Sequence, residues 1–238
     1  MSKASELVSV LFFFFVILSF SSCSAYSPEI ASLFWRLEIS VPDGGEYTEG
    51  LRLFVLADDR DGIEDVGSLR LDCTERELSW TVEEDKLIII DRNGEAWYGY
   101  PRFEMPNEDR FPRASYEVTL IDKGGRESSV RFSIDDSISF NDAILPFRSE
   151  TDALALVLPG EQANWLDTEF RLYNEMDDSV LSEKATVGDD GVLHFPKKLL
   201  ARGRGKDATQ WRAYAYDRSS GIAVLFGPCD LSQEEGAQ

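Results

Sequence analysis

The densest group of carboxylates in the chain lies in the stretch DDRDGIED. Its first three acids are Asp58, Asp59 and Asp61. Calcium takes about six to eight oxygen ligands, and acids at alternating positions of a loop supply several of them. The spacing does not match the EF-hand pattern, and aspartates that bond their own backbone in a turn account for the same residues. We therefore predict no metal site, and these three aspartates are only weak calcium candidates.

Motifs for catalysis are missing. The sequence contains no G-x-S-x-G, H-E-x-x-H, P-loop or G-x-G-x-x-G pattern, so nucleophile elbows, zinc proteases and phosphate cradles have no support. Glycoside hydrolysis needs two facing carboxylates, and nothing singles out one pair among 44 acidic residues. The only histidine, His194, lies in the alternating segment VLHFP, which favours a surface or edge strand position over a general base. We predict no catalytic residue, no enzyme activity and no cofactor; an envelope hydrolase is the least favoured alternative.

Aromatic residues in the segment AWYGYPRF are the stronger lead toward binding. A strand turns about half of its side chains into the core, and the others are left to stack on sugar rings or to anchor a protein partner. The alternative is that the glycine and proline of this segment bend it and bury both sets. The candidate ligand-binding residues are Trp97, Tyr98, Tyr100 and Phe103.

The charge of the chain limits its partners. It carries 44 acidic and 24 basic residues, a net charge of −20, and its pI is about 4.4. The average field therefore repels nucleic acid and anionic membrane surfaces, so we predict no nucleic-acid partner. The same acidity also keeps an exported protein soluble.

The N-terminus has the layout of a secretory signal peptide. An apolar run of fourteen residues from Leu7 to Phe20 follows Lys3, and it is too short to span a bilayer comfortably. The junction from Phe20 to Cys23 (Phe-Ser-Ser-Cys) resembles the relaxed lipobox of spirochaete lipoproteins, although the usual pattern has leucine where this chain has Phe20.

The lipobox resemblance implies that residues 1–22 are removed and that Cys23 is acylated, as with palmitate. Several acyl chains give stable attachment, because each buried methylene contributes about 0.8 kcal/mol. The alternative is cleavage after Ala25, which leaves a soluble protein that begins at Tyr26.

The elements behind these residues are strands. Apolar and polar residues alternate from Leu33 to Val41, and again on both arms of a predicted hairpin from Tyr116 to Ile134, whose turn contains Asp122 and two glycines. No segment after Phe20 sustains a helical apolar period. The fold class is therefore all-β.

The aspartate-rich turn from Asp58 to Leu71 and the YEVTLIDKGG hairpin resemble bacterial Ig-like or fibronectin type III-like modules. The resemblance implies an antiparallel β-sandwich from Leu33 to Asp135, in which Tyr116 is a tyrosine-corner residue that bonds backbone. It implies no binding site, because such sandwiches host unrelated activities.

The second half of the chain repeats the first. The segment from Leu69 to Leu71 matches the one from Phe170 to Leu172, and Tyr116 to Asp122 matches Trp211 to Asp217. We predict a tandem duplication, with one large sandwich as the alternative. The predicted map is a lipoprotein signal peptide (1–22), a tether (23–32), two Ig-like sandwiches (33–135 and 136–232) and a disordered tail (233–238).

Cys73 and Cys229 fall in different predicted sandwiches, so we expect free or buried thiols rather than a disulfide. The expected protein is exported and anchored to a bacterial membrane, facing the periplasm or the exterior. Its expected role is non-catalytic binding or scaffolding with an envelope or host protein, and membrane contact is through the lipid. A carbohydrate-binding module that uses the segment from Trp97 to Phe103 is the alternative function.

Overall fold

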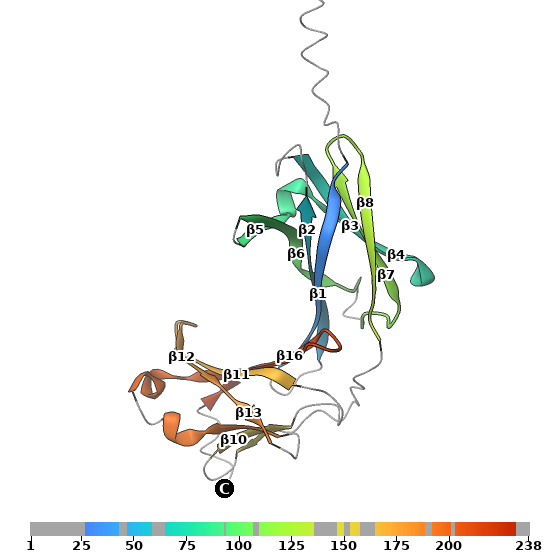
Figure 1. The fold of residues 1–238 in the computed structure, drawn as a ribbon. Coiled ribbons are helices and arrows are strands. Elements are labelled where there is room, and N and C mark those ends of the chain that lie inside the picture. The colour runs from blue at the N-terminus through green and yellow to red at the C-terminus, as the bar shows by residue number, and fades with distance from the viewer. Residues whose placement is uncertain are drawn as a thin grey trace, which may run out of the picture.

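The chain folds into two β-sandwiches that share one sheet (Figure 1). The computed structural model describes residues 27–42, 47–58, 65–92, 94–106, 110–135, 147–149, 153–157, 165–188, 192–200 and 203–231. The all-β fold class with two tandem sandwiches is confirmed. Within those ranges, helical structure is limited to short 3-10 turns (Thr74–Arg76, Glu84–Lys86, Lys197–Leu199 and Gly203–Asp207), and no helix is long and apolar enough to cross a membrane.

The first sandwich packs two sheets of four strands against each other. One has the order β4-β3-β7-β8 and the other contributes the order β1-β2-β6-β5. The strands are β1 (Glu29–Val41), β2 (Thr48–Asp58), β3 (Val66–Cys73), β4 (Leu78–Glu83), β5 (Ile88–Arg92), β6 (Glu95–Glu104), β7 (Ser115–Asp122) and β8 (Glu127–Ser133).

The second sandwich has the same strand order. Its sheets run β12-β11-β15-β16 and β13-β14-β10-β9, so each strand corresponds to the one eight places earlier. The strands are β9 (Phe147–Ser149), β10 (Ala153–Val157), β11 (Trp165–Tyr173), β12 (Ser179–Lys184), β13 (Thr186–Val187), β14 (Val192–Pro196), β15 (Gln210–Asp217) and β16 (Ile222–Asp230).

This shared order supports the predicted duplication, because the matched segments lie in corresponding strands. Leu69 to Leu71 lies in β3 and Phe170 to Leu172 in β11. Asp122 and Asp217, which end β7 and β15, are both buried, and each accepts a hydrogen bond from a backbone amide of the following turn. The buried aspartate therefore closes the same hairpin turn twice.

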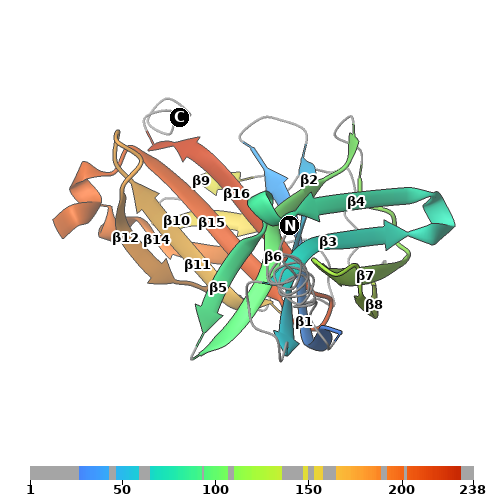
Figure 2. The ribbon, with the colours of Figure 1, turned by 90° about the horizontal axis from the view of Figure 1, so that it is seen from above.

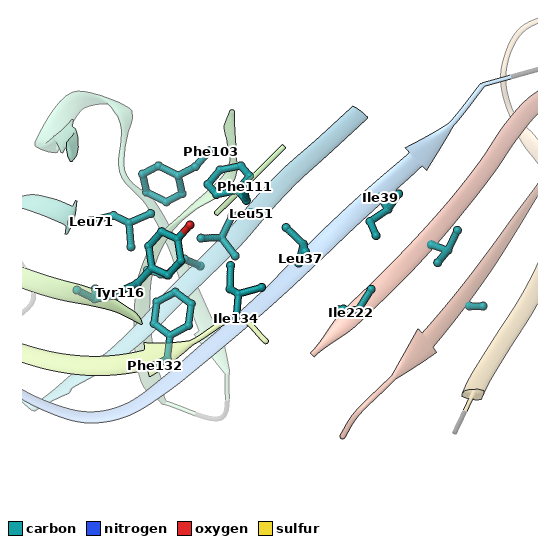
Figure 3. Close-up of a cluster of buried hydrophobic side chains, with 14 of the residues drawn as sticks. Leu37, Ile39, Leu51, Leu71, Phe103, Phe111, Tyr116, Phe132, Ile134 and Ile222 are labelled. Carbon is teal, nitrogen blue, oxygen red and sulfur yellow. The ribbon is translucent and has the colours of Figure 1, made fainter. Parts of the chain in front are cut away.

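Strand β1 joins the two sandwiches. Its C-terminal half pairs in parallel with β16, Leu37 to Val41 against Ile222 to Phe226, and this merges two four-stranded sheets into one of eight. Apolar and polar residues alternate along this half of β1, whereas β16 is apolar throughout from Ile222 to Phe226. Leu37, Ile39 and Ile222 are almost completely buried (Figure 3). Seen from above, β1, β2 and β6 lie between the other sheet of the first sandwich and the strands of the second (Figure 2).

Tyr116 confirms the prediction of a tyrosine corner. Its hydroxyl donates a hydrogen bond of 2.8 Å to the backbone carbonyl of Pro112, and its ring stacks on Phe132 with centroids 5.4 Å apart. Burial raises the pKa of this hydroxyl well above its usual value. Cys73, buried, and Cys229, half-buried, are not joined by a disulfide, as expected.

Two local expectations need correction. Strand β1 begins at Glu29, so residues 29–32 belong to the first sandwich and not to the tether; the backbone amide of Ile30 donates to Ser128 Oγ at 3.2 Å. His194 lies on β14, which has β10 and β13 as neighbours, so the edge alternative is wrong; its side chain is half-buried. The predicted boundary at residue 136 and the predicted tail lie outside the described residues.

Candidate ligand-binding face

Both smaller sheets cover the same face of the eight-stranded sheet, because the core residues Leu37 and Ile222 are direct partners on that face. The opposite face, called here the outer face, carries the alternate residues of each strand. Four arginines occupy outward positions close to the junction of the sandwiches: Arg36 on β1, Arg52 on β2, Arg171 on β11 and Arg212 on β15.

These arginines face one another in pairs. Arg36 lies directly opposite Arg52 in the register of β1 and β2, and Arg171 lies directly opposite Arg212 in that of β11 and β15. Like charges at directly opposite positions destabilise a sheet. The face therefore holds two unfavourable pairs in a protein whose net charge is −20.

Three of the four arginines have a carboxylate neighbour. Arg52 Nε lies 2.8 Å from Glu38 Oε1, although the N–H is not aligned for a hydrogen bond. Arg171 pairs with Glu169 at 2.8 Å, and this hydrogen bond raises the pKa of its guanidinium. Arg212 pairs with Asp177 at 2.6 Å.

Arg36 is held differently. Its guanidinium carbon lies 4.3 Å from the ring centre of Tyr216, 5.2 Å from that of Phe34 and 5.6 Å from that of Tyr214. Its Nε is buried without a hydrogen-bond partner, and no carboxylate of the described residues forms an ion pair with it. The rings fix the planar guanidinium, while its donors stay unused.

Tyr214 adds a neutral donor beside Arg36. Burial raises the pKa of its hydroxyl to about 12, which outweighs the opposing influence of the Arg36 charge. The hydroxyl is therefore protonated at neutral pH. A protonated phenol next to a fixed guanidinium forms a site for an acceptor such as a carboxylate oxygen.

Two hollows of the outer face adjoin at Arg36 and Arg52, which line both. The larger has a volume of about 630 Å³ and extends to Arg171, Tyr173 and Arg212 on the second sandwich. Glu38 is the single carboxylate among its described lining residues. The smaller, of about 220 Å³, extends over the first sandwich to Arg92 and Trp97. The larger volume falls within the range of small-molecule sites.

A glycine shapes the smaller hollow. Gly99 on β6 lies opposite Phe54 on β2, and a Cβ at Gly99 would come within about 2.5 Å of the Phe54 ring. The absent side chain leaves room for the Phe54 ring, which lines the hollow together with Trp97. The glycine therefore helps to form an aromatic floor.

The structure separates the four aromatic residues predicted to bind a ligand. Trp97 is half-buried and lines the smaller hollow. Tyr98 and Phe103 are 1% and 2% exposed and belong to the core, which corrects the prediction for these two. Tyr100 packs its ring edge-on against Phe103, with centroids 5.2 Å apart, and lies on the same inward side. Alternation along β6 turns Tyr98 and Tyr100 inward, and a register shift between β2 and β6 brings Phe103 to the same side.

Cys23, Asp59 and Asp61 lie outside the described residues, and of Asp58 only the backbone is described, at the end of β2. No group of three or more potential metal ligands lies together in the part of the chain that the structure describes.

Sequence reasoning missed the arginine pairs. Each arginine is visible at an outward position of an alternating strand, as in LFWRLE, GLRLF, FRLY and WRAYAYD. The signal that could have found them lies at neighbouring outward positions of the same strands. Phe34, Tyr214 and Tyr216 are aromatic there, where a solvent-facing strand normally has polar residues. Which strands become neighbours across the two sandwiches is not visible in the sequence.

Comparisons with known proteins identify no family. No protein-family model matches the chain, and no curated protein matches it. Among solved structures, Tp47, the 47-kilodalton lipoprotein of Treponema pallidum, aligns at 12% identity and a TM-score of 0.42, over 87% of this chain and 52% of that one. The chain thus spans about half the length of that protein.

Two further structures are more distant. Native α2-macroglobulin from Escherichia coli, spanning domains MG0-NIE-MG1, aligns at 14% identity and a TM-score of 0.26, over 86% of this chain and 64% of that one. The pullulanase SAP of Group B Streptococcus aligns at 10% identity and a TM-score of 0.23, over 80% and 23%. Likeness at these levels says nothing about the function of this chain.

Proposed function

We propose that this is an exported, lipid-anchored protein of the bacterial cell envelope that acts by non-catalytic binding, with the outer face of the eight-stranded sheet as its binding surface. The observation that supports the proposal is the placement of two opposed arginine pairs on one face of an acidic protein. Packing does not require such pairs, since the core lies on the other face.

The anchor in this proposal is an acylated Cys23. Strand β1 begins six residues later, at Glu29, and six extended residues span at most about 20 Å. The sandwiches would therefore stay close to the membrane, with the N-terminal end of β1 nearest to it. Contact with the bilayer would come from the acyl chains, because the acidic chain is repelled by anionic lipid surfaces.

Two observations favour binding over catalysis. The larger hollow contains four arginines and one carboxylate, and that carboxylate is already beside Arg52. General acid and base chemistry instead uses carboxylates or histidine facing a substrate. His194 lies on β14, outside the eight-stranded sheet.

A protein partner in the envelope or a host macromolecule remains the broad class of target. The alternative, a carbohydrate-binding module, keeps one specific observation in its favour: Trp97 lines a hollow whose floor includes Phe54. Of the four aromatic residues first considered for that role, Trp97 is the one that would take part.

Site-specific photocrosslinking in intact cells tests the binding surface. A benzophenone amino acid at Trp97 or Tyr173, both on the outer face, should give adducts, whereas the same group at Arg131 should not. Arg131 is a suitable control because its side chain is 77% exposed on β8, in the other sheet. An absence of adducts at both outer-face positions, or equal adducts at Arg131, would contradict the proposal.

The anchor has its own test. Cys23→Ala should move the protein from the membrane fraction to the soluble fraction, and metabolic labelling with a clickable palmitate analogue should be lost. Unchanged partition would mean that Cys23 is not the anchor.

A further inference from the structure

We infer that the outer face binds a carboxylate-bearing oligosaccharide, with Arg36 and Arg52 at the centre of the site. The inference rests on the proposed function, because it names the ligand class of that same surface. The two hollows, which share these arginines, form the site: one reaches Arg171 and Arg212, and the other reaches Arg92 and Trp97.

The first step concerns the extent of the surface. Leu37 of β1 pairs with Ile222 of β16, whereas Ala213 of β15 pairs with Phe226, further along β16. Arg36 immediately precedes Leu37, and Arg212 immediately precedes Ala213. The backbone positions of the two arginines are therefore about 20 Å apart along the strands, at about 3.3 Å per residue. That separation is between backbone positions, and the side chains of both arginine pairs line one hollow; an elongated ligand that fills this hollow also reaches the adjoining one at Trp97.

The second step concerns hydrogen bonding. Strands β2, β1, β16 and β15 have neighbours on both sides, so most of their backbone groups are committed to the sheet. The exceptions are at register shifts, which leave Arg52 without a partner on β6 and Gly227 and Pro228 without partners on β15. What the outer face offers is mainly side-chain donors: guanidinium groups, which only donate, and phenols, which also accept. The matching ligand is rich in acceptors, and guanidinium groups match carboxylates in a bidentate manner.

This donor excess favours a sugar chain over an acidic peptide. A peptide brings one backbone N–H for almost every carbonyl, and those donors need acceptors. Of the acceptors among the described lining residues of the larger hollow, Glu38 is beside Arg52 and Ser40 Oγ accepts from Arg102 at 3.4 Å, which leaves the phenol oxygens of Tyr173 and Tyr214 as side-chain acceptors. Peptides that use backbone bonds attach to sheet edges, not to sheet faces.

The third step concerns charge density. The five arginines of the two hollows exceed the three carboxylates that neighbour them (Glu38, Glu169 and Asp177), so the surplus of positive charge is local and small. The whole chain, at −20, repels a dense polyanion. An oligosaccharide with carboxylates on some sugar units and neutral hydroxyls on the others matches the small local surplus and is not a dense polyanion. Its sugar rings can lie on Trp97, Phe34 and Tyr173.

Calorimetric titration of the full-length lipoprotein in neutral detergent tests the inference. The probe is a galacturonate oligosaccharide, and its fully methyl-esterified form is the matched neutral probe. We expect the acid to bind with an affinity that falls as salt rises, and the ester to bind at least tenfold more weakly. Failure of the acid to bind, or equal binding of the ester, would overturn the inference.

Variants locate the site. Arg36→Gln should weaken the binding of the acid about 10- to 100-fold, the loss expected when a hydrogen bond to a charged group disappears. Arg36→Lys should recover only part of the affinity, because lysine lacks the planar fork. Arg131→Gln should bind like the wild type. Equal losses for Arg36→Gln and Arg131→Gln would overturn the assignment, and unchanged melting temperatures verify that the variants are folded.

A glutamate oligopeptide is the last probe. Binding as tight as that of the galacturonate chain would overturn the sugar assignment in favour of an acidic peptide. Outer-face crosslinks in cells without galacturonate binding would leave the proposed function in place and remove this inference. Absence of both the outer-face crosslinks and galacturonate binding would remove the proposed function as well as this inference.

Discussion

Arg36 on β1 lies directly opposite Arg52 on β2, and Glu38, two residues further along β1, contacts only the second of them. The Arg36 guanidinium is instead surrounded by Tyr216, Phe34 and Tyr214. Aromatic rings stabilise a guanidinium without using its hydrogen-bond donors. The charge of Arg36 is therefore stabilised by the rings, while its hydrogen-bond donors remain available to a ligand.

The carboxylate between these arginines should be important for stability. Glu38 is 6% exposed, and Glu38→Gln removes the carboxylate that neighbours Arg52, one of the two opposed guanidinium groups. We expect the variant to lose about 1–3 kcal/mol of unfolding free energy in urea denaturation. The double variant Glu38→Gln/Arg52→Gln should be more stable than the single variant. Arg52→Gln alone completes the double-mutant cycle, and a coupling energy of zero would show that Arg52 and Glu38 are not coupled.

A second prediction concerns the buried ion pair of the first sandwich. Arg113 Nη2 and Nη1 donate to both oxygens of Glu49 at 2.8 Å, and the Glu49 side chain is fully buried. Arg113→Ala should therefore cost about 3–5 kcal/mol, because it leaves a buried charge without its partner. The matched control is Arg131→Ala, whose exposed pair with Glu117 should contribute at most about 1 kcal/mol. Chemical denaturation of both variants measures the loss of unfolding free energy, and a similar loss for the two would contradict the prediction.

The sequence predicts the strands and the repeat well, because alternation with a period of two is a local property. It identified the hairpin of Tyr116, its tyrosine corner and its counterpart at Trp211. It did not reveal the parallel pairing of β1 with β16, since pairing between residues about 185 apart leaves no local pattern. The larger hollow depends on that pairing, because both sandwiches line it. Trp97 alone among the predicted binding aromatics lines the candidate site, in the hollow of the first sandwich.

A third prediction concerns the contact between the sandwiches. Gly221, in the turn before β16, has φ of +70°, and a Cβ there would lie 2.7 Å from the Trp35 ring, which stacks on Phe132 at 4.9 Å. Gly221→Ala should destabilise the protein through both backbone strain and displacement of Trp35. Gly125→Ala is the matched control, because Gly125 has φ of +78° and nothing within 4 Å of its Cβ position.

Thermal or urea unfolding separates the two contributions at Gly221. The control should lose about 1 kcal/mol from the positive φ alone. Gly221→Ala should lose about 1–3 kcal/mol more, the usual cost of overpacking. Equal losses would mean that Trp35 moves away at no cost, and that the turn does not hold β1 against β16.

The fourth prediction is a dependence of stability on alkaline pH that involves the site itself. Burial raises the pKa of Tyr214 from 10.0 to about 12. Below pH 10 the phenol is protonated in the folded and the unfolded chain, so its contribution to stability is constant. Between pH 10 and about 12 only the unfolded chain loses the proton, and stability falls as the pH rises. Tyr116, whose pKa burial also raises, adds to the same trend.

Tyr214→Phe should lessen the fall in stability while leaving stability at pH 7 nearly unchanged. In a titration that follows tyrosinate absorbance, the wild type and the variant should show the same number of tyrosines titrating near pH 10, because Tyr214 titrates at about 12. A fall of equal size in the wild type and in Tyr214→Phe would show that the hydroxyl beside Arg36 is hydrated like a surface tyrosine.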